Sequence, residues 1–117
     1  MNLMTNVVRY LDYRILIVSG EIDFSTGPAL RAAIFRLLEE STLPLLIDMA
    51  AVTFCDSTGL NLAVTARRHA ATHGGTLALL APTESVAKIF RITHLDQHIP
   101  IYKTRLDAVL GLLAKPA

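Results

Sequence analysis

Short apolar runs alternate along the chain with segments whose apolar residues recur every three or four positions. The runs Ile15–Val18, Leu45–Ile47 and Leu77–Leu80 are apolar on both faces, which is typical of strands inside a sheet. The segments between them have helical spacing, and a strand that returns through a helix lies parallel to the strand before it. The pattern therefore predicts an α/β domain with a mixed, mostly parallel sheet of four to five strands.

The chain begins with a predicted β-hairpin. Residues 1–6 are expected to be a loose end, and residues 7–11 a short strand. Residues 12–13 suit the turn, and residues 14–19 form the second strand. Residues 20–24 are predicted to form the loop that follows.

Two helices are predicted to follow strands of this sheet. The first is capped by Ser25 or Thr26, with Pro28 in its first turn, where proline is well tolerated. The second spans Ser57 to about Thr72, and the glycines at positions 74–75 end it. The residues expected to be buried on these two helices are Leu30, Ile34, Leu37, Leu38, Leu60, Ala63, Val64 and Ala71.

The pattern in the last part of the chain predicts two more helices and a short strand. Thr83 is expected to cap the first of these helices, His98–Ile101 to form the strand, and residues 104–113 to form the final helix. The simplest interpretation of the final helix is core packing, and an interaction surface is the alternative. The inner faces of the two helices are predicted to be Val86, Ile89 and Phe90, and Leu106, Val109, Leu110 and Leu113.

The segment between the central strand and the second helix is predicted to be a loop. Asp48 breaks the apolar run Leu45–Ile47 and is expected to begin it. Phe54 and Cys55 are predicted to be small buried anchors beside this loop.

The stretch Val52–Val64 holds the candidate functional residues. Asp56 and Ser57 are both common N-cap residues, because their side chains accept hydrogen bonds from free N–H groups at a helix start. Ser57 therefore has two interpretations, a helix cap and an exposed hydroxyl open to modification. A phosphate on Ser57 would lie where the helix N–H groups and the helix dipole favour negative charge.

Composition narrows the classes of function. The chain has 117 residues, which fits a single domain over residues 1–117, and 52% are hydrophobic, enough for a core. A net charge of +1 gives no electrostatic case for binding nucleic acid or an acidic membrane surface. No apolar run approaches the roughly 18 residues of a membrane-spanning helix, and the start lacks a signal-peptide pattern. With one cysteine, which suits a reducing compartment, the chain is expected to be cytoplasmic.

Two motifs together resemble a known family. They are Gly20–Asp23, followed by Thr26, Pro28, Leu30 and Arg31, and the run Phe54–Leu60. Over nearly its whole length the chain resembles the STAS domain of bacterial anti-sigma factor antagonists. The resemblance implies one domain with about four helices mainly on one face of the sheet.

The resemblance also implies partner switching. The unphosphorylated form would bind an anti-sigma factor that is also a GHKL-type serine kinase, phosphorylation at Ser57 would release it, and a PP2C-type phosphatase would reset it. The alternative within the same fold is a subunit of a stressosome-type or transport-associated complex. The positions that the resemblance assigns to partner binding are Asp23, Ser25, Asp56, Thr58, Gly59, Leu60 and Asn61.

Catalytic and metal sites have little support in the sequence. His69 and His73 have the i, i+4 spacing of two metal ligands, but Ala70 stands where a zinc protease has its glutamate. Cys55 stands where a nucleophile elbow requires its first glycine, and no base is paired with Ser57 by pattern. We therefore expect no metal, no cofactor and no enzymatic activity, with a small serine hydrolase as the competing interpretation.

Overall fold

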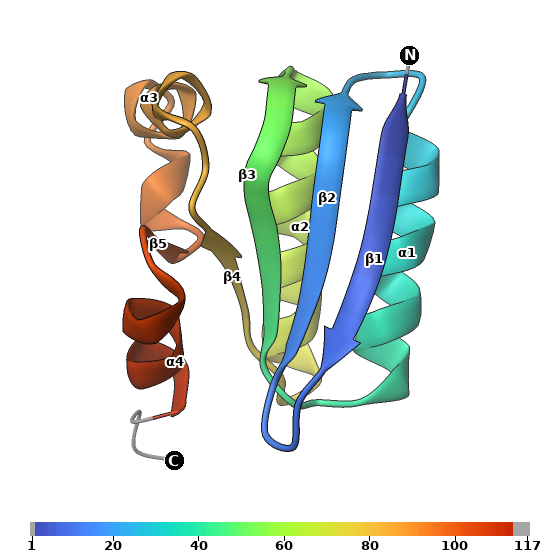
Figure 1. Cartoon of the computed structure of the whole chain (residues 1–117), viewed down its shortest axis with the longest axis vertical. Helices are drawn as coiled ribbons and strands as arrows, with labels where there is room; N and C mark the ends of the chain where they lie inside the picture. Colours follow the sequence, from blue (N-terminus) through green and yellow to red (C-terminus); the bar gives the residue numbers. More distant parts are fainter. Residues whose placement is uncertain (1, 114–117) are drawn as a thin grey trace.

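The strands lie side by side in the order of the sequence (Figure 1). The computed structural model describes residues 2–113. β1 pairs with β2 antiparallel, and the β2–β3, β3–β4 and β4–β5 pairs are parallel, so the predicted mixed, mostly parallel sheet is confirmed. The elements are β1 (Leu3–Arg9), β2 (Arg14–Ile22), α1 (Gly27–Glu40), β3 (Leu45–Cys55), α2 (Ser57–Thr72), β4 (Leu77–Leu80), α3 (Glu84–Ile92), the 3₁₀ turn η1 (Leu95–Gln97), β5 (Ile101–Tyr102) and α4 (Arg105–Leu113).

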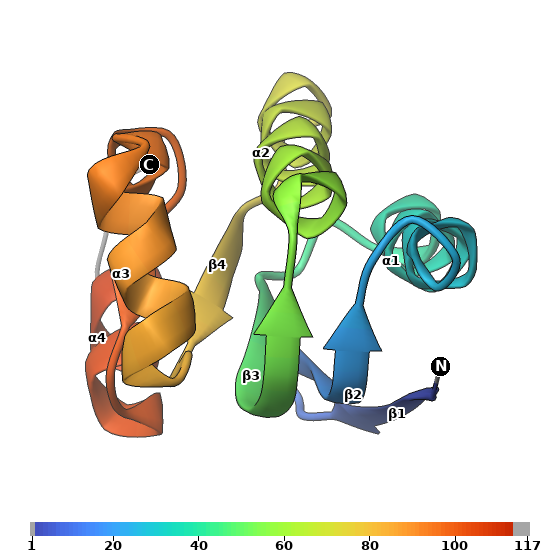
Figure 2. The same ribbon diagram turned by 90° about the horizontal axis from the view of Figure 1, so that it is seen from above.

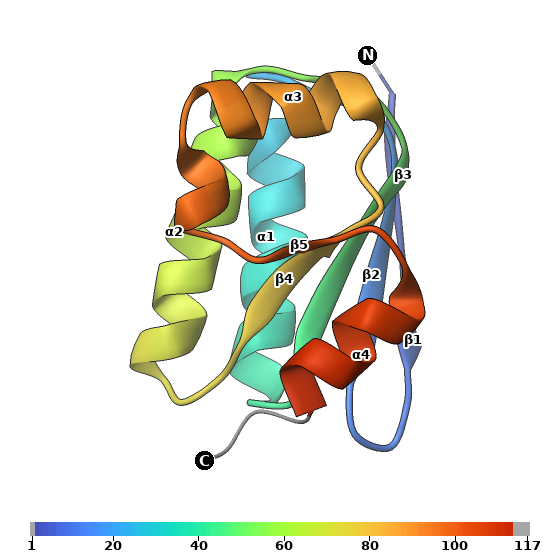
Figure 3. The same ribbon diagram turned by 90° about the vertical axis from the view of Figure 1, so that its left-hand side faces the viewer.

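Helices cover both faces of the sheet, but unequally. α1 and α2 lie on the same side of β1, β2 and β3 (Figure 2), where they pack on side chains such as Leu16 and Ile47. Phe90 of α3 belongs to the same core. α4 lies on the other side of β4 (Figure 3), and its Ala108 packs with Leu46 and Ala78. The prediction of helices mainly on one face is confirmed.

β3 is much longer than predicted. Residues 48–55, expected to be a loop, form the second half of this strand, and residues 20–22 extend β2 beside it. Two β-bulges explain why the pattern misled: Ile17 and Ser19 are two residues apart, whereas their partners Asp48 and Ala51 are three apart. A second bulge follows, because Gly20 and Glu21 pair with Val52 and Phe54. Each bulge interrupts the alternation that identifies a strand.

Other boundaries differ from prediction at the ends of the chain. β1 begins at Leu3, so part of the expected loose end is strand, because β1 pairs along β2 as far as Gly20. β5 is Ile101–Tyr102, and residues 98–100, predicted to belong to it, precede the strand.

Burial agrees with prediction on some helix faces and not on others. α2 spans the predicted Ser57–Thr72. The largest disagreement is α4, whose leucine stripe was predicted to be core. Leu106 is 66% exposed and Leu110 57% exposed, because α4 meets the sheet through Ala108 instead. On the other helices Leu30, Ile34, Leu37, Leu60, Ala63, Val86 and Phe90 are buried as predicted, Leu38 and Val64 are half-buried, and Ala71 and Ile89 are exposed.

Candidate functional site

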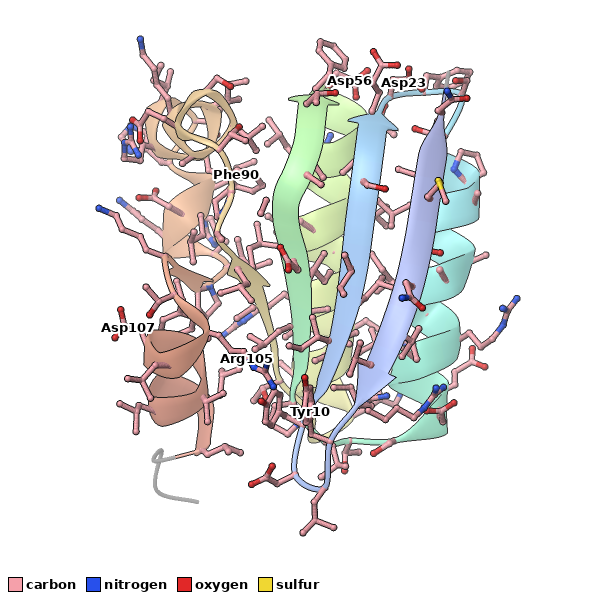
Figure 4. The ribbon with its side chains drawn as sticks, in the orientation of Figure 1. Tyr10, Asp23, Asp56, Phe90, Arg105 and Asp107 are labelled. Atoms are coloured by element: carbon pink, nitrogen blue, oxygen red, sulfur yellow. The ribbon has the colours of Figure 1, made fainter. Side chains whose placement is uncertain are left out.

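The turns that follow β2 and β3 lie close together at one edge of the sheet, as the labelled Asp23 and Asp56 show (Figure 4). The backbone N–H of Asp56 donates to the carbonyl oxygen of Ile22 at 3.1 Å, so a hydrogen bond joins the two turns. α1 and α2 begin at the same edge, because a helix that follows a parallel strand starts near the end of that strand. The topology therefore brings the two sequence motifs together.

The Asp23 carboxylate organises the turn between β2 and α1. Its Oδ1 accepts hydrogen bonds from the backbone N–H groups of Ser25 at 2.9 Å and Thr26 at 3.0 Å, and from the Ser25 hydroxyl at 2.7 Å. The Ser25 hydroxyl, followed by the Thr26 N–H, lowers the pKa of Asp23. Thr26 takes the N-cap position of α1, but its hydroxyl donates to the carbonyl oxygen of Glu21 at 2.8 Å instead of capping the helix.

Asp56 is the N-cap of α2. Its Oδ1 accepts a hydrogen bond from the Thr58 N–H at 2.9 Å. Ser57 is the first helical residue, and its side chain is exposed. Among residues 2–113 the Ser57 hydroxyl has no hydrogen-bond partner, whether histidine or any other group. Of the two candidate caps, Asp56 fills the role, and the Ser57 hydroxyl is left accessible.

Two of the predicted partner-binding residues lie beneath this surface. Gly59 is buried, and a Cβ atom there would meet Cys55 Sγ and come within 2.7 Å of Ile22 Cγ2. Leu60 is only 6% exposed and packs into the core. Both residues therefore hold the start of α2 against the sheet and so fix the position of Ser57.

The residues just before Asp56 have opposite environments. Cys55 is buried as predicted, and burial, followed by the nearby Asp56 charge, raises the pKa of its thiol to about 11. Such a thiol stays protonated at neutral pH and is a poor nucleophile. Phe54, predicted to be a buried anchor, is 47% exposed, because it projects from the bulged end of β3 on the other side from Cys55.

An open groove of about 470 Å³ between α1 and α2 adds residues to which the sequence analysis gave no role in binding. Thr58 and Asn61, both predicted to bind the partner, line it on the α2 side. Phe24, Pro28 and Arg31 line the opposite side, and Phe24 is 85% exposed. The sequence signals were an aromatic residue within a polar turn and the presence of Pro28 and Arg31 in the first motif, and their meaning depends on how the two helices pack.

Neither a metal centre nor a membrane span is formed by residues 2–113. The His69 and His73 rings are 4.3 Å apart between centroids, and Nδ1 of His73 hydrogen bonds to the carbonyl oxygen of His69 at 2.9 Å. No three His, Cys, Asp or Glu side chains in this range are grouped to hold a metal ion. No helix in it is long and apolar enough to cross a membrane.

The sequence profile of the STAS domain family matches residues 4–108. The chain belongs to the STAS domain family. The match runs from β1 into α4 and includes both turns of the candidate site. The resemblance inferred from the two motifs is therefore confirmed at the level of the family.

Relatives of this STAS domain are named as antagonists. The anti-sigma-B factor antagonist of Staphylococcus epidermidis is 30% identical over 95 residues, which cover 81% of this chain and 88% of the relative. The anti-sigma-B factor antagonist of Bacillus subtilis (strain 168) is 34% identical over 84 residues, covering 72% and 76%. A crystal structure of an anti-sigma factor antagonist from Mycobacterium paratuberculosis matches with a TM-score of 0.87 at 30% identity, covering 96% of this chain and 95% of that one.

Proposed function

We propose that this STAS domain is an anti-sigma factor antagonist that works by partner switching. In the unphosphorylated state the domain binds an anti-sigma factor that is also a GHKL-type serine kinase. Phosphorylation of Ser57 releases the domain from this partner. The relatives named as antagonists support the regulatory role. The observation that carries the mechanism is the Ser57 hydroxyl, exposed at the first residue of α2 while Asp56 occupies the cap position.

The phosphate is expected to leave the fold of the domain unchanged. It adds a charge of about −1.5 to −2 at pH 7. The free N–H groups at the start of α2 stabilise a charge at an exposed site by only about 0.3–1 kcal/mol. The carboxylates of Asp56 and Asp23, which lie at the same edge of the sheet, repel it. These local effects are small and opposed.

The main effect of phosphorylation is expected on the affinity of the domain for its partner. A partner packed over Ser57 would have to remove water from a dianion, which costs several kcal/mol unless a cation meets it. Gly59 and Leu60 take part by supporting the surface from beneath. The side chains proposed to contact the partner are those of Asp23, Ser25, Asp56, Ser57, Thr58 and Asn61.

The domain needs no catalytic residue of its own in this scheme. The kinase transfers the phosphoryl group, and a PP2C-type phosphatase removes it to reset the switch. What supports this division is that the Ser57 hydroxyl is accessible to other proteins but has no neighbouring base among residues 2–113. A hydroxyl without an adjacent base is a weak nucleophile.

The experiment uses the GHKL-type serine kinases encoded by the genome that carries this chain, each purified and tested in turn. With ATP and Mg²⁺, the intact mass of the wild type is expected to rise by one phosphate. The Thr58→Ala variant is expected to gain the same phosphate, and Ser57→Ala none. Phosphate retained on Ser57→Ala would assign the modification to another residue.

Binding is then measured by titration calorimetry. Ser57→Asp is expected to bind the kinase at least about tenfold more weakly than Ser57→Ala, a difference of about 1.4 kcal/mol. Both variants are expected to keep the circular dichroism spectrum of the wild type. Equal affinities of the two variants would remove Ser57 from the interface and end the proposed mechanism.

A further inference from the structure

The groove between α1 and α2 is continuous with the proposed partner surface. Thr58 and Asn61 belong to both. The two helices touch near their starts, because a Cβ atom at Gly27 would lie 2.7 Å from the Cγ2 atom of Thr58. A partner seated over Ser57 therefore extends directly into the groove along α2.

Phe24 gives the groove an apolar anchor. It is 85% exposed, more than any other Phe or Tyr side chain in residues 2–113, so the ring forfeits the stabilisation that burial would provide. The turn that carries it is fixed by the hydrogen bonds from Ser25 and Thr26 to Asp23. Little backbone freedom is lost when a partner covers a side chain held in this way. Buried aromatic anchors of this kind dominate the energetics of many interfaces.

Arg31 gives the groove its one charge. The other lining residues are uncharged, and none of them carries a carboxylate. The guanidinium carbon of Arg31 lies 4.4 Å from the centroid of the Phe35 ring, which holds the side chain along α1. Both ion pairs found within residues 2–113 lie elsewhere, at Arg9 and Arg91. The groove is thus an apolar recess with one uncompensated positive charge.

We propose that this groove determines which partner the domain accepts, through an apolar side chain of the partner seated against Phe24 and a carboxylate seated against Arg31. The inference rests on the proposed function, since the partner is the kinase that modifies Ser57. A kinase without that carboxylate would leave Arg31 desolvated and unpaired, which disfavours its binding. The phosphorylation state of Ser57 then controls when the domain binds its partner, and Phe24 and Arg31 determine which partner it binds.

The inference also gives phosphorylation a second point of action. Thr58, the residue after Ser57, lines the groove. A phosphate on Ser57 therefore adds negative charge next to a residue of the groove in which the partner's carboxylate is seated. Repulsion between the two adds to the cost of desolvating the phosphate, and both favour release.

The test measures the affinity of single variants for the kinase that phosphorylates Ser57. Phe24→Ala and Arg31→Glu are each expected to weaken binding at least about tenfold. Two matched controls change exposed side chains outside the groove, Arg36→Glu on α1 and Leu106→Ala on α4. Both controls are expected to stay within about twofold of the wild type. Circular dichroism checks that every variant is folded.

Salt dependence tests the carboxylate separately. The affinity of the wild type is expected to fall as salt is raised, and that of Arg31→Ala to fall less, because one charge pair is missing. Tighter binding by Arg31→Glu would show that the partner presents a cation and would overturn this part of the inference.

The remaining outcomes separate this inference from the proposed function. If Phe24→Ala and Arg31→Glu bind like the wild type while Ser57→Asp does not bind, the role of the groove is refuted and the phosphorylation switch at Ser57 is supported. If Ser57→Ala and Ser57→Asp bind equally while the groove variants bind weakly, the phosphorylation switch is refuted and the groove is supported as a docking site. If none of the purified kinases binds the wild type, both are overturned.

Discussion

At the start of α2, two adjacent polar side chains have separate environments. The Asp56 carboxylate accepts the 2.9 Å hydrogen bond from the Thr58 N–H, whereas the Ser57 hydroxyl is exposed. Replacing Asp56 with alanine is expected to lower the free energy of unfolding by about 1 kcal/mol, the usual value of an N-cap side chain. Ser57→Ala is expected to cost less than about 0.5 kcal/mol, as substitutions at open surface positions do. Urea denaturation measures both, and a greater loss from Ser57→Ala would contradict the assignment of the cap.

Asp23 links the stability of the domain to pH. Its pKa is lowered from 3.8, chiefly by the Ser25 hydroxyl, so as the pH falls the unfolded chain takes up the proton before the folded chain does. The stabilisation by the carboxylate is therefore complete above about pH 5 and is lost as the pH falls through 3.8 towards the lower folded-state pKa.

The free energy of unfolding of the wild type is accordingly expected to exceed that of Asp23→Ala by a constant amount from about pH 5 to 7, and by less below about pH 4. Thermal unfolding of the two proteins at a series of pH values measures the difference. Asp12→Ala serves as the control, since Asp12 is exposed in the turn of the hairpin and receives none of these hydrogen bonds. A wild-type advantage that persists undiminished into strong acid would contradict the role of the Asp23 carboxylate.

At the scale of elements, the fold could be predicted wherever a local pattern determines it. The apolar runs of β2 and β4 and the spacing of α2 are local, and these predictions held. The second half of β3 is not determined by a local pattern, because its buried residues Met49, Val52 and Cys55 recur every three positions. That period arises from bulges against β2 and matches neither a regular strand nor a helix.

The same distinction applies to the candidate site. Asp23 and Asp56 belong to the two motifs that carry the family resemblance, and the resemblance assigned both of them to partner binding. Phe24 and Arg31 could not be assigned from sequence, because the groove exists only where α1 packs beside α2. A linear pattern shows that a helix is amphipathic, but the distance to its neighbour depends on residues such as Gly27 and Thr58.

Burial of α4 provides a prediction at this scale. Leu46 of β3 is completely buried, and its replacement by alanine is expected to cost about 2–4 kcal/mol through lost contacts and the cavity left behind. Leu106 of α4 was expected from its spacing to be a core residue but is 66% exposed. Leu106→Ala is therefore expected to change the free energy of unfolding by less than about 0.5 kcal/mol. Chemical denaturation of the two variants compares them, and similar losses would place Leu106 in the core.

At the scale of the whole molecule, Arg105 joins the last helix to the first hairpin (Figure 4). Its Nε and Nη2 atoms donate to the Tyr13 hydroxyl at 3.0 and 2.7 Å, and its guanidinium carbon lies 4.3 Å from the centroid of the Tyr10 ring. Because most of the leucine stripe on α4 is exposed, this contact and the packing of Ala108 against the sheet together hold the helix in place.

Arg105→Ala is therefore expected to loosen α4 selectively. The substitution removes the cation–π contact with Tyr10 and both hydrogen bonds to Tyr13, all made at an exposed site. Amide hydrogen exchange is expected to accelerate in α4 and to stay unchanged in α2, which packs on the other face of the sheet. Lys103→Ala, a change at an exposed neighbouring position, is the control. Equal acceleration in both helices would mean that the contact stabilises the domain globally.

The bulges in β3 also allow two strands of unequal length to start and end at the same levels of the sheet. β2 has 9 residues and β3 has 11, yet Arg14 pairs with Leu45 where they start and Ile22 pairs with Cys55 where they end. Removing one residue from β3 would draw Ser57 back by about 3.3 Å relative to Asp23 and turn the following side chains to the opposite face. A single-residue deletion between positions 49 and 53 is thus expected to abolish the proposed partner binding while leaving every proposed contact residue in the sequence. Substitutions at the exposed positions 50, 51 and 53 would preserve this register, whereas a change in the length of the segment would not.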